Sequence, residues 1–376
     1  MKKVIILNHG LHISGVSRTL VNFANALVKN GYDVTIKIEI NDFTLAKELS
    51  PKVKCSLFLD EPRPFGKQIK GFLRYYKNWV KKLLKLSPEE KYKKVVKDKY
   101  NIEIAFNRGA AANIISGSTN KNAKKLVWVH NNYMKNDNPL AGFSNLEDAQ
   151  LGYSKYDHIV CVSMDAEESF KERFGDDFPL VTRYNIMDTE RITELAREKS
   201  FKKQCFTIVC VGRLSEQKNY TLLMDSLKLL CEKGYLFECI IVGGGYLEQE
   251  LLKYRNNLGL SCVKFIGLKT NPYAYMGNAD LYVSSSIYEG LSTTTIEAII
   301  LGKPCVVTNC AGMKEILGNN NEYGMVVPIE KNALADAIET MMTNNTIRKE
   351  YELKALEGAK RFQPEKLFES IEELFI

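Results

Sequence analysis

Short apolar segments typical of β-strands alternate with helix-like segments along most of this chain, and the alternation limits the folds that it can adopt. A strand at 4–7 leads into a glycine-bearing loop at 9–15 and then a helix with apolar residues at three-to-four spacing. A charged stretch at 188–204 interrupts the alternation, which restarts with a strand at 206–211. Further strands are expected at 34–38, 102–106, 126–129, 158–162, 236–242, 262–266, 280–284, 305–308 and 325–327, and helices at 219–232 and 246–258. The sequence therefore predicts an α/β protein of two doubly wound domains with parallel sheets, which bind ligands at the carboxyl ends of their strands.

Length and cysteine usage are consistent with this organisation. The 376 residues exceed one ordinary core, which favours two domains. The nine cysteines form no C-x-x-C pair and most lie in apolar runs, as expected in a reducing cytosol. The apolar core of the first ten residues is too short for a signal peptide, and no run is long enough to span a bilayer. We therefore expect a cytoplasmic protein that is not integral to a membrane.

Two carboxylates, Glu289 and Glu297, lie eight positions apart in the segment 284–302. The first is expected in a loop after a strand and the second one turn into an apolar helix. The N-terminus of such a helix carries unpaired N–H groups and partial positive charge, which suit a phosphate. Acids beside an anion site are useful where they bind hydroxyls of the same ligand. A nucleotide sugar combines a diphosphate with such hydroxyls.

Two cations, Arg213 and Lys218, follow the strand at 206–211 and the flexible Gly212. A leaving nucleoside diphosphate gains negative charge as the glycosidic bond breaks, and fixed cations stabilise that transition state. Both residues are equally compatible with ordinary surface cations. The glycines at 243–245 also end a strand before a helix, but they do not complete the dinucleotide-binding fingerprint.

His130 ends the strand at 126–129 in the first domain, where α/β sites are built. His130 is either a catalytic residue or an ordinary loop histidine whose hydrogen bonds are satisfied, and both interpretations remain open. Gly10 and Gly15 bracket the first glycine-bearing loop. The four histidines show no metal-ligand spacing and no D-x-D motif is present, so we expect no metal and no cofactor.

Residues 67–99 contain twelve Lys or Arg residues against three acids. Apolar residues recur at helical spacing between Ile69 and Leu84, and a second stripe is basic. The basic stripe consists of Lys70, Arg74, Lys77, Lys81 and Lys85. The helix either covers its own domain or docks on an anionic membrane surface. Nucleic acid is not expected, because no nucleic-acid motif accompanies the patch.

Four motifs together resemble the retaining GT-B glycosyltransferases of family 4, also called glycosyl transferases group 1. They are VGRLSEQKN at 211–219, IVGGG at 241–245, EGLSTTTIE at 289–297 and LGKPCVVTNCAGMKEIL at 301–317. The resemblance implies a GT-B fold, in which two Rossmann-like domains face a central cleft. It implies an acceptor-binding domain at 1–187, a nucleotide-sugar-binding domain at 188–361, and a C-terminal helix at 362–376 that crosses back to the first domain.

The resemblance also implies roles for individual residues. Arg213 and Lys218 would bind the donor diphosphate, Glu289 the donor sugar and Glu297 the ribose hydroxyls, with His130 near the reacting face of the sugar. The further donor-binding residues would be Gly15, Gly212, Gly243, Gly244, Leu268, Gly290, Leu291 and Ser292. Two departures stand out: Leu291 to Thr293 occupy a place where many members carry a Pro, and the N-terminal loop lacks a double glycine. The implied mechanism is front-face attack, in which the departing phosphate accepts the proton of the acceptor, without a covalent adduct on Glu289.

The expected function is transfer of a hexose or N-acetylhexosamine from a UDP-sugar to a glycan acceptor. The basic helix favours a polyprenyl-diphosphate-linked acceptor at the inner face of the cell membrane, as in bacterial capsule, exopolysaccharide or O-antigen synthesis. Two alternatives remain open: a soluble sugar or sugar-phosphate glycosyltransferase, and a nucleotide-sugar-binding protein without turnover.

Overall fold

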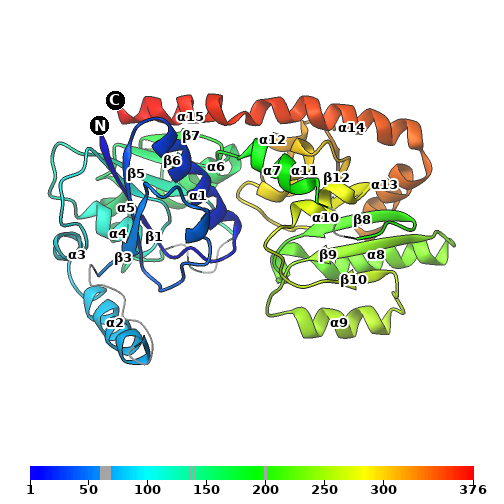
Figure 1. Ribbon diagram of the computed structural model, residues 1–376, viewed down its shortest axis with the longest axis horizontal. Helices are drawn as coiled ribbons and strands as arrows, with labels where there is room; N and C mark the ends of the chain where they lie inside the picture. Colours follow the sequence, from blue (N-terminus) through cyan, green and yellow to red (C-terminus); the bar gives the residue numbers. More distant parts are fainter. Residues whose placement is uncertain (60–68, 136–137, 139, 199–200) are drawn as a thin grey trace. The chain divides into compact units, whose positions relative to one another are not determined.

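The computed structural model describes residues 1–59, 69–135, 138, 140–198 and 201–376, with the backbone alone for 69–72. The chain forms two compact units (Figure 1). Unit 1 contains Met1–Ile186 and Glu365–Ile376, and unit 2 contains Met187–Pro364. Each unit is built around a parallel sheet.

The described part of unit 1 has a seven-stranded parallel sheet in the order β3-β2-β1-β4-β5-β6-β7. The strands are β1 (Lys3–Asn8), β2 (Asp33–Ile38), β3 (Lys54–Leu57), β4 (Ile102–Ala105), β5 (Lys124–Val129), β6 (His158–Cys161) and β7 (Leu180–Thr182). The sequence analysis did not anticipate β3 and β7. Both are short edge strands with partly exposed residues, so neither has the apolar run that marks a buried parallel strand.

The α-helices of unit 1 are α1 (Gly15–Lys29), α2 (Ile69–Leu83), α3 (Pro88–Val95), α4 (Ala110–Ser116), α5 (Leu146–Tyr153), α6 (Met164–Phe174) and α15 (Pro364–Glu372). Of these, α2 extends away from the sheet (Figure 1). Phe23 of α1 packs on Phe106 and Trp128, with ring centroids 5.7 and 5.2 Å away. Ser14 caps α1 by accepting the N–H of Ser17, so the glycine-bearing loop after β1 leads directly into a helix N-terminus.

Unit 2 has a six-stranded parallel sheet in the order β10-β9-β8-β11-β12-β13 within its described residues. The strands are β8 (Phe206–Val211), β9 (Phe237–Val242), β10 (Val263–Phe265), β11 (Leu281–Ser284), β12 (Cys305–Thr308) and β13 (Met325–Val327). The helices are α7 (Thr189–Ala196), α8 (Tyr220–Glu232), α9 (Glu248–Asn257), α10 (Tyr273–Asn278), α11 (Thr293–Ile300), α12 (Met313–Leu317), α13 (Lys331–Thr343) and α14 (Asn345–Ala359). α8, α9 and α13 share one apolar core with alternate residues of the strands. The doubly wound architecture predicted from the alternation is confirmed for both units.

The expected charged connector contains helix α7, which Asp188 caps by accepting the N–H of Arg191. At the other boundary, α15 packs with unit 1 although α14 belongs to unit 2. The Tyr32 hydroxyl donates to Glu372 at 2.6 Å, and Arg183 Nε donates to the Ser370 carbonyl at 2.7 Å. In the described residues, no helix has the length and apolar character needed to cross a bilayer.

Candidate functional site: the carboxyl edges of the two sheets

The loops that carry the predicted cations and acids leave neighbouring strands in unit 2. β8 and β11 pair in the middle of the sheet, and the strand order runs in opposite directions on either side of them. The loop after β8 holds Arg213 and Lys218, and the loop after β11 holds Glu289. Ligands of open α/β sheets bind at this kind of reversal, outside the carboxyl ends of the strands.

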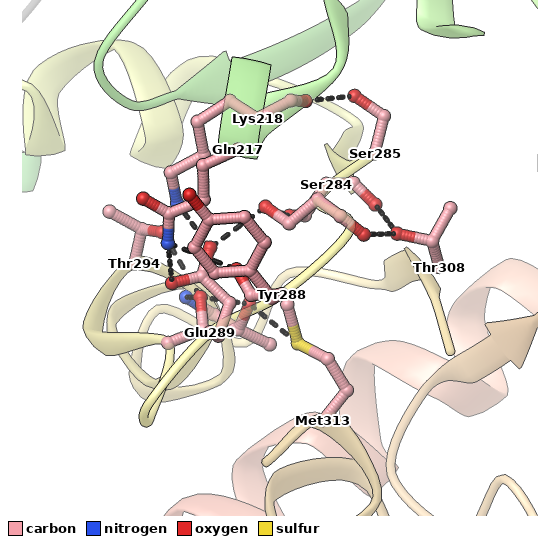
Figure 2. Close-up of polar contacts among 12 residues, drawn as sticks. Gln217, Lys218, Ser284, Ser285, Tyr288, Glu289, Thr294, Thr308 and Met313 are labelled. Atoms are coloured by element: carbon pink, nitrogen blue, oxygen red, sulfur yellow. Dashed lines mark hydrogen bonds and ion pairs between the residues drawn. The ribbon is translucent and has the colours of Figure 1, made fainter. Parts of the chain in front are cut away.

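Lys218 and Glu289 form a partly buried ion pair at this point (Figure 2). The Lys218 ammonium donates to Glu289 Oε1 at 2.6 Å, and the two side chains are 14% and 9% exposed. The Ser286 hydroxyl donates to the same oxygen at 2.8 Å. Such a charge-assisted pair with low exposure fixes both side chains more firmly than a surface pair would.

Gln217 was not predicted as a site residue, yet it bridges the same two loops (Figure 2). Its Nε2 donates to Glu289 Oε2 at 3.2 Å and to the Tyr288 carbonyl at 2.9 Å. The Ser285 hydroxyl also donates to the Lys218 carbonyl at 2.7 Å. Sequence patterns gave no sign of these contacts, because they join residues about 70 positions apart whose types are ordinary in polar loops.

Both oxygens of Glu289 therefore accept hydrogen bonds from the protein. A carboxylate held in this way is a weak nucleophile, because its lone pairs are directed at fixed donors. Arg213 differs from Lys218: its side chain is exposed, and within the described residues no acceptor pairs with it. Its five N–H donors suit the oxygens of a diphosphate.

The predicted glycines Gly212, Gly243 and Gly244 allow the loops after β8 and β9 to approach each other closely. Gly243 has a φ of 152°, and a Cβ there would collide with the Gly212 carbonyl oxygen. The Gly212 N–H donates to the Val242 carbonyl at 3.0 Å, and the Leu214 N–H donates to the Gly244 carbonyl at 3.0 Å. A side chain at Gly243 would thus separate the cation loop from its neighbour.

Ser292 caps α11, the helix that carries the second acid. Its hydroxyl accepts the N–H of Thr295 at 3.4 Å. Glu297 lies in the second turn, is 4% exposed and accepts the Tyr273 hydroxyl at 3.0 Å on Oε1. Tyr273 was also missed, because it occurs in a segment that reads as ordinary core.

The remaining predicted donor-binding residues differ in exposure. Leu268 is 59% exposed, whereas Leu291 is buried beside Gly290. A Cβ on Gly312 would meet the Gly290 carbonyl oxygen at 2.8 Å, so the loop after β12 supports the acid loop. Only small residues fit where these loops meet.

His130 lies at the carboxyl edge of the sheet in unit 1. Its Nε2 bonds the Phe106 carbonyl at 3.0 Å, and because a carbonyl only accepts, Nε2 carries the proton and Nδ1 is an acceptor. Burial lowers the pKa of His130 to about 4, so the imidazole is neutral at pH 7. Gly15, the other predicted residue of unit 1, is the exposed first residue of α1.

The basic helix α2 packs on unit 1 through one face. Tyr76 is buried and its hydroxyl donates to the Glu39 carbonyl at 2.6 Å, while Leu83 is also buried. Arg74, Lys77, Lys81 and Lys85 are exposed, and the side chain of Lys70 lies outside the described residues. The packed face is that of an ordinary surface helix, and membrane contact through the basic face stays a prediction.

Residues 192–357 match the family model described as "Glycosyl transferases group 1". The match lies within unit 2, so this part of the chain is similar to the group 1 glycosyltransferases. The resemblance to glycosyl transferases group 1 and the GT-B fold class predicted from the motifs are confirmed, whereas the retaining, family 4 assignment stays a prediction. The cleft between the domains and the role of each site residue stay predictions.

Two curated relatives and one solved structure illustrate the similarity. An uncharacterized glycosyltransferase of Methanocaldococcus jannaschii is 27% identical over 65% of this chain and 70% of its own length. The N-acetylgalactosamine-N,N'-diacetylbacillosaminyl-diphospho-undecaprenol 4-alpha-N-acetylgalactosaminyltransferase of Campylobacter jejuni is 33% identical over 49% of this chain, which spans half of that relative. The crystal structure of Anabaena HepE with UDP and glucose has a TM-score of 0.76 at 19% identity over 99% of both chains.

Metal ligands form no cluster in the part of the chain that the structure describes. No group of three or more His, Cys, Asp or Glu side chains there is arranged to hold an ion. The charged groups in the loops after β8 and β11 are Arg213, Glu216, Lys218 and Glu289, and Glu216 accepts the Tyr246 hydroxyl.

Proposed function

We propose that this glycosyltransferase moves a hexose or N-acetylhexosamine from a UDP-sugar to a lipid-linked glycan with retention of anomeric configuration. The observation that carries the proposal is the Lys218–Glu289 pair, beside exposed Arg213, at the reversal of strand order in unit 2. The pair offers cation donors for a diphosphate and carboxylate oxygens for sugar hydroxyls in one place. The name of the Campylobacter relative, which describes transfer to a diphospho-undecaprenol-linked glycan, supports the acceptor class.

In this mechanism Arg213 and Lys218 stabilise the negative charge that develops on the leaving diphosphate. Lys218 has N–H donors beyond the one that bonds Glu289, so it can contact a phosphate while it stays paired. The two cations supply the neutralisation that a divalent metal supplies elsewhere, and the proposed reaction needs no metal. Chelation should leave turnover unchanged.

Retention in the proposed mechanism comes from attack on the face that the diphosphate leaves. A covalent intermediate would need a nucleophilic carboxylate. Glu289 is poorly suited, since both of its oxygens accept hydrogen bonds from the protein. The departing phosphate oxygen then accepts the proton of the acceptor hydroxyl.

The proposed location is the inner face of the bacterial cell membrane, in synthesis of a capsule, exopolysaccharide or O-antigen. The exposed cations of α2 support it, because each Lys or Arg near an anionic surface contributes about 1 kcal/mol. Replacing Arg74, Lys77 and Lys81 by Gln should release the protein from anionic vesicles while leaving donor hydrolysis intact. Equal vesicle binding by the wild type and this variant would contradict membrane contact.

Slow hydrolysis of UDP-, GDP- and ADP-sugars tests the donor without needing the acceptor. UDP-sugars should be hydrolysed fastest, and hydrolysis should fall in the Lys218→Met variant. The matched control is Lys228→Met, which removes a partly exposed cation from α8 that pairs only weakly with Glu232 at 3.6 Å. Hydrolysis of no nucleotide sugar, with UDP still bound, would favour a binding protein without turnover.

A further inference from the structure

Unit 1 contains a pocket of about 700 Å³ that the proposed reaction does not use. It lies where the N-terminal turns of α3 and α5 come together with α4 and the chain after α2. Its polar lining includes Lys85, Ser87, Lys91, Asn113, Ser144 and Asp148. The sequence predicted Lys85 as part of the basic stripe that is a candidate for membrane contact, and the other lining residues were not predicted.

The pocket contains a buried cation whose hydrogen-bond partner is neutral. Lys91 is 6% exposed, and its ammonium donates to Asn113 Oδ1 at 2.5 Å. An ammonium has three donors, so two remain beyond this bond. Burial lowers the pKa of Lys91, and the nearby Asp148 carboxylate opposes that shift only in part, so a further negative partner would stabilise the buried charge.

Asn113 adds unused donors. Because Lys91 only donates, the atom that faces it is the amide oxygen, and Asn113 Nδ2 keeps two N–H groups. Asn113 is 3% exposed, and no other described residue accepts a hydrogen bond from this amide. This nitrogen is not among the buried polar atoms without a partner, so it is accessible to solvent, and the acceptor oxygens of a ligand can bond it directly.

The charges around the pocket favour an anion. Lys85 and Lys91 supply two cations against one carboxylate, Asp148, whose Oδ2 already accepts the Ser144 N–H at 2.9 Å. The first turns of α3 and α5 carry their own acids, Glu89 and Glu90 in α3 and Glu147 beside Asp148 in α5, so the attraction for an anion comes from the two lysines and not from these helix ends. Leu84, 43% exposed, adds an apolar surface to the lining.

We propose that this pocket binds a phosphate or diphosphate group through Lys91, Asn113 and Lys85. Acceptor-only oxygens match the unused donors, and the negative charge matches the excess of cations. The group can belong to a lipid-linked acceptor or to a free phosphorylated compound. The site does not depend on the transfer reaction proposed for unit 2.

Titration of the full chain with inorganic pyrophosphate by calorimetry tests the site, with saturating UDP present to occupy the nucleotide site. We expect binding that persists under UDP and that Lys91→Met weakens about 10-fold or more. Asn113→Asp should weaken it as much, because a carboxylate repels the anion while still accepting the Lys91 bond. This variant keeps the test valid if Lys91→Met does not fold.

The matched control is Lys93→Met. Lys93 is an exposed cation on the same helix, α3, and pairs with Glu89. Unchanged pyrophosphate affinity in Asn113→Asp, or complete displacement of pyrophosphate by UDP, would overturn the site. UDP titration of the same variants reports separately on the nucleotide site. A short prenyl diphosphate that binds more tightly than pyrophosphate identifies a lipid source through Leu84, and equal affinities identify a free anion.

Discussion

The two sheets place their first and fourth strands side by side, yet their carboxyl edges carry different chemistry. In unit 2 the edge holds the Lys218–Glu289 ion pair, in which Glu289 also accepts hydrogen bonds from Gln217 and Ser286. In unit 1 the corresponding edge holds the buried, neutral His130 and a half-exposed His9 that pairs with Glu39 at 2.8 Å after β1 and β2. One topology therefore supports a partly buried ion pair in unit 2 and, in unit 1, a buried neutral imidazole with a more exposed pair, and the loop residues decide which.

The largest expected effect is at the charged edge. Lys218→Met should lower kcat about 100-fold to 1,000-fold, because a fixed cation no longer stabilises the leaving diphosphate. Steady-state rates with a UDP-sugar would measure it, with Lys228→Met as the control. Turnover within threefold of the wild type would remove Lys218 from the mechanism.

Glu297 should influence nucleotide binding more than turnover. Glu297→Gln keeps the volume and an acceptor for the Tyr273 hydroxyl but removes the charge. We expect the Kd for UDP to rise about 10-fold, in line with the loss of one charge-assisted hydrogen bond. Calorimetric titration measures this change, and an unaltered Kd would contradict ribose binding by Glu297.

Gln217 is expected to act as a positioning residue for Glu289. Gln217→Leu removes the bonds to Glu289 and to the Tyr288 carbonyl, so kcat should fall about 5-fold to 10-fold. The Kd for UDP should stay unchanged, since Gln217 is proposed to hold only the sugar-facing acid. Gln249→Leu, at an exposed position of α9, is the control. A matching loss of UDP affinity would point to general disorder of the loop instead.

His130 in unit 1 should show the smallest effect on rate. With a pKa of about 4, His130 stays neutral from pH 6 to 9. The pH–rate profiles of the wild type and of His130→Asn should therefore have the same shape near pH 6.5. The free energy of unfolding should decrease in acid. The unfolded chain gains a proton on this histidine below pH 6.5 and the folded chain only near pH 4, so unfolding becomes easier as pH falls.

The free energy of unfolding should fall by on the order of 3 kcal/mol below pH 4 because of this histidine. Urea unfolding of the wild type and of His130→Asn at pH 4.5 and 7.5 would measure the difference. An equal pH dependence of the two proteins would show that His130 is not buried as described.

Hydrophobic patterning predicted most of the fold. Central strands such as β1 and β8 are continuous apolar runs, because a strand of a parallel sheet is covered on both faces. The same reasoning could not find β3, whose residues are partly exposed at the sheet edge. Strand ends also marked the loops that hold Arg213, Lys218 and Glu289, since a change from apolar to polar residues is a local signal.

The sequence by itself determined the strand–helix alternation, the two-domain organisation and the residue types at the charged edge, because these depend on local periodicity and composition. Only the tertiary structure decided that Lys218 pairs with Glu289, that Gln217 joins their loops, and that Lys91 meets Asn113 in a pocket. Each of these contacts joins residues distant in the chain. Which distant residues meet depends on strand order and helix packing, and no local pattern encodes either.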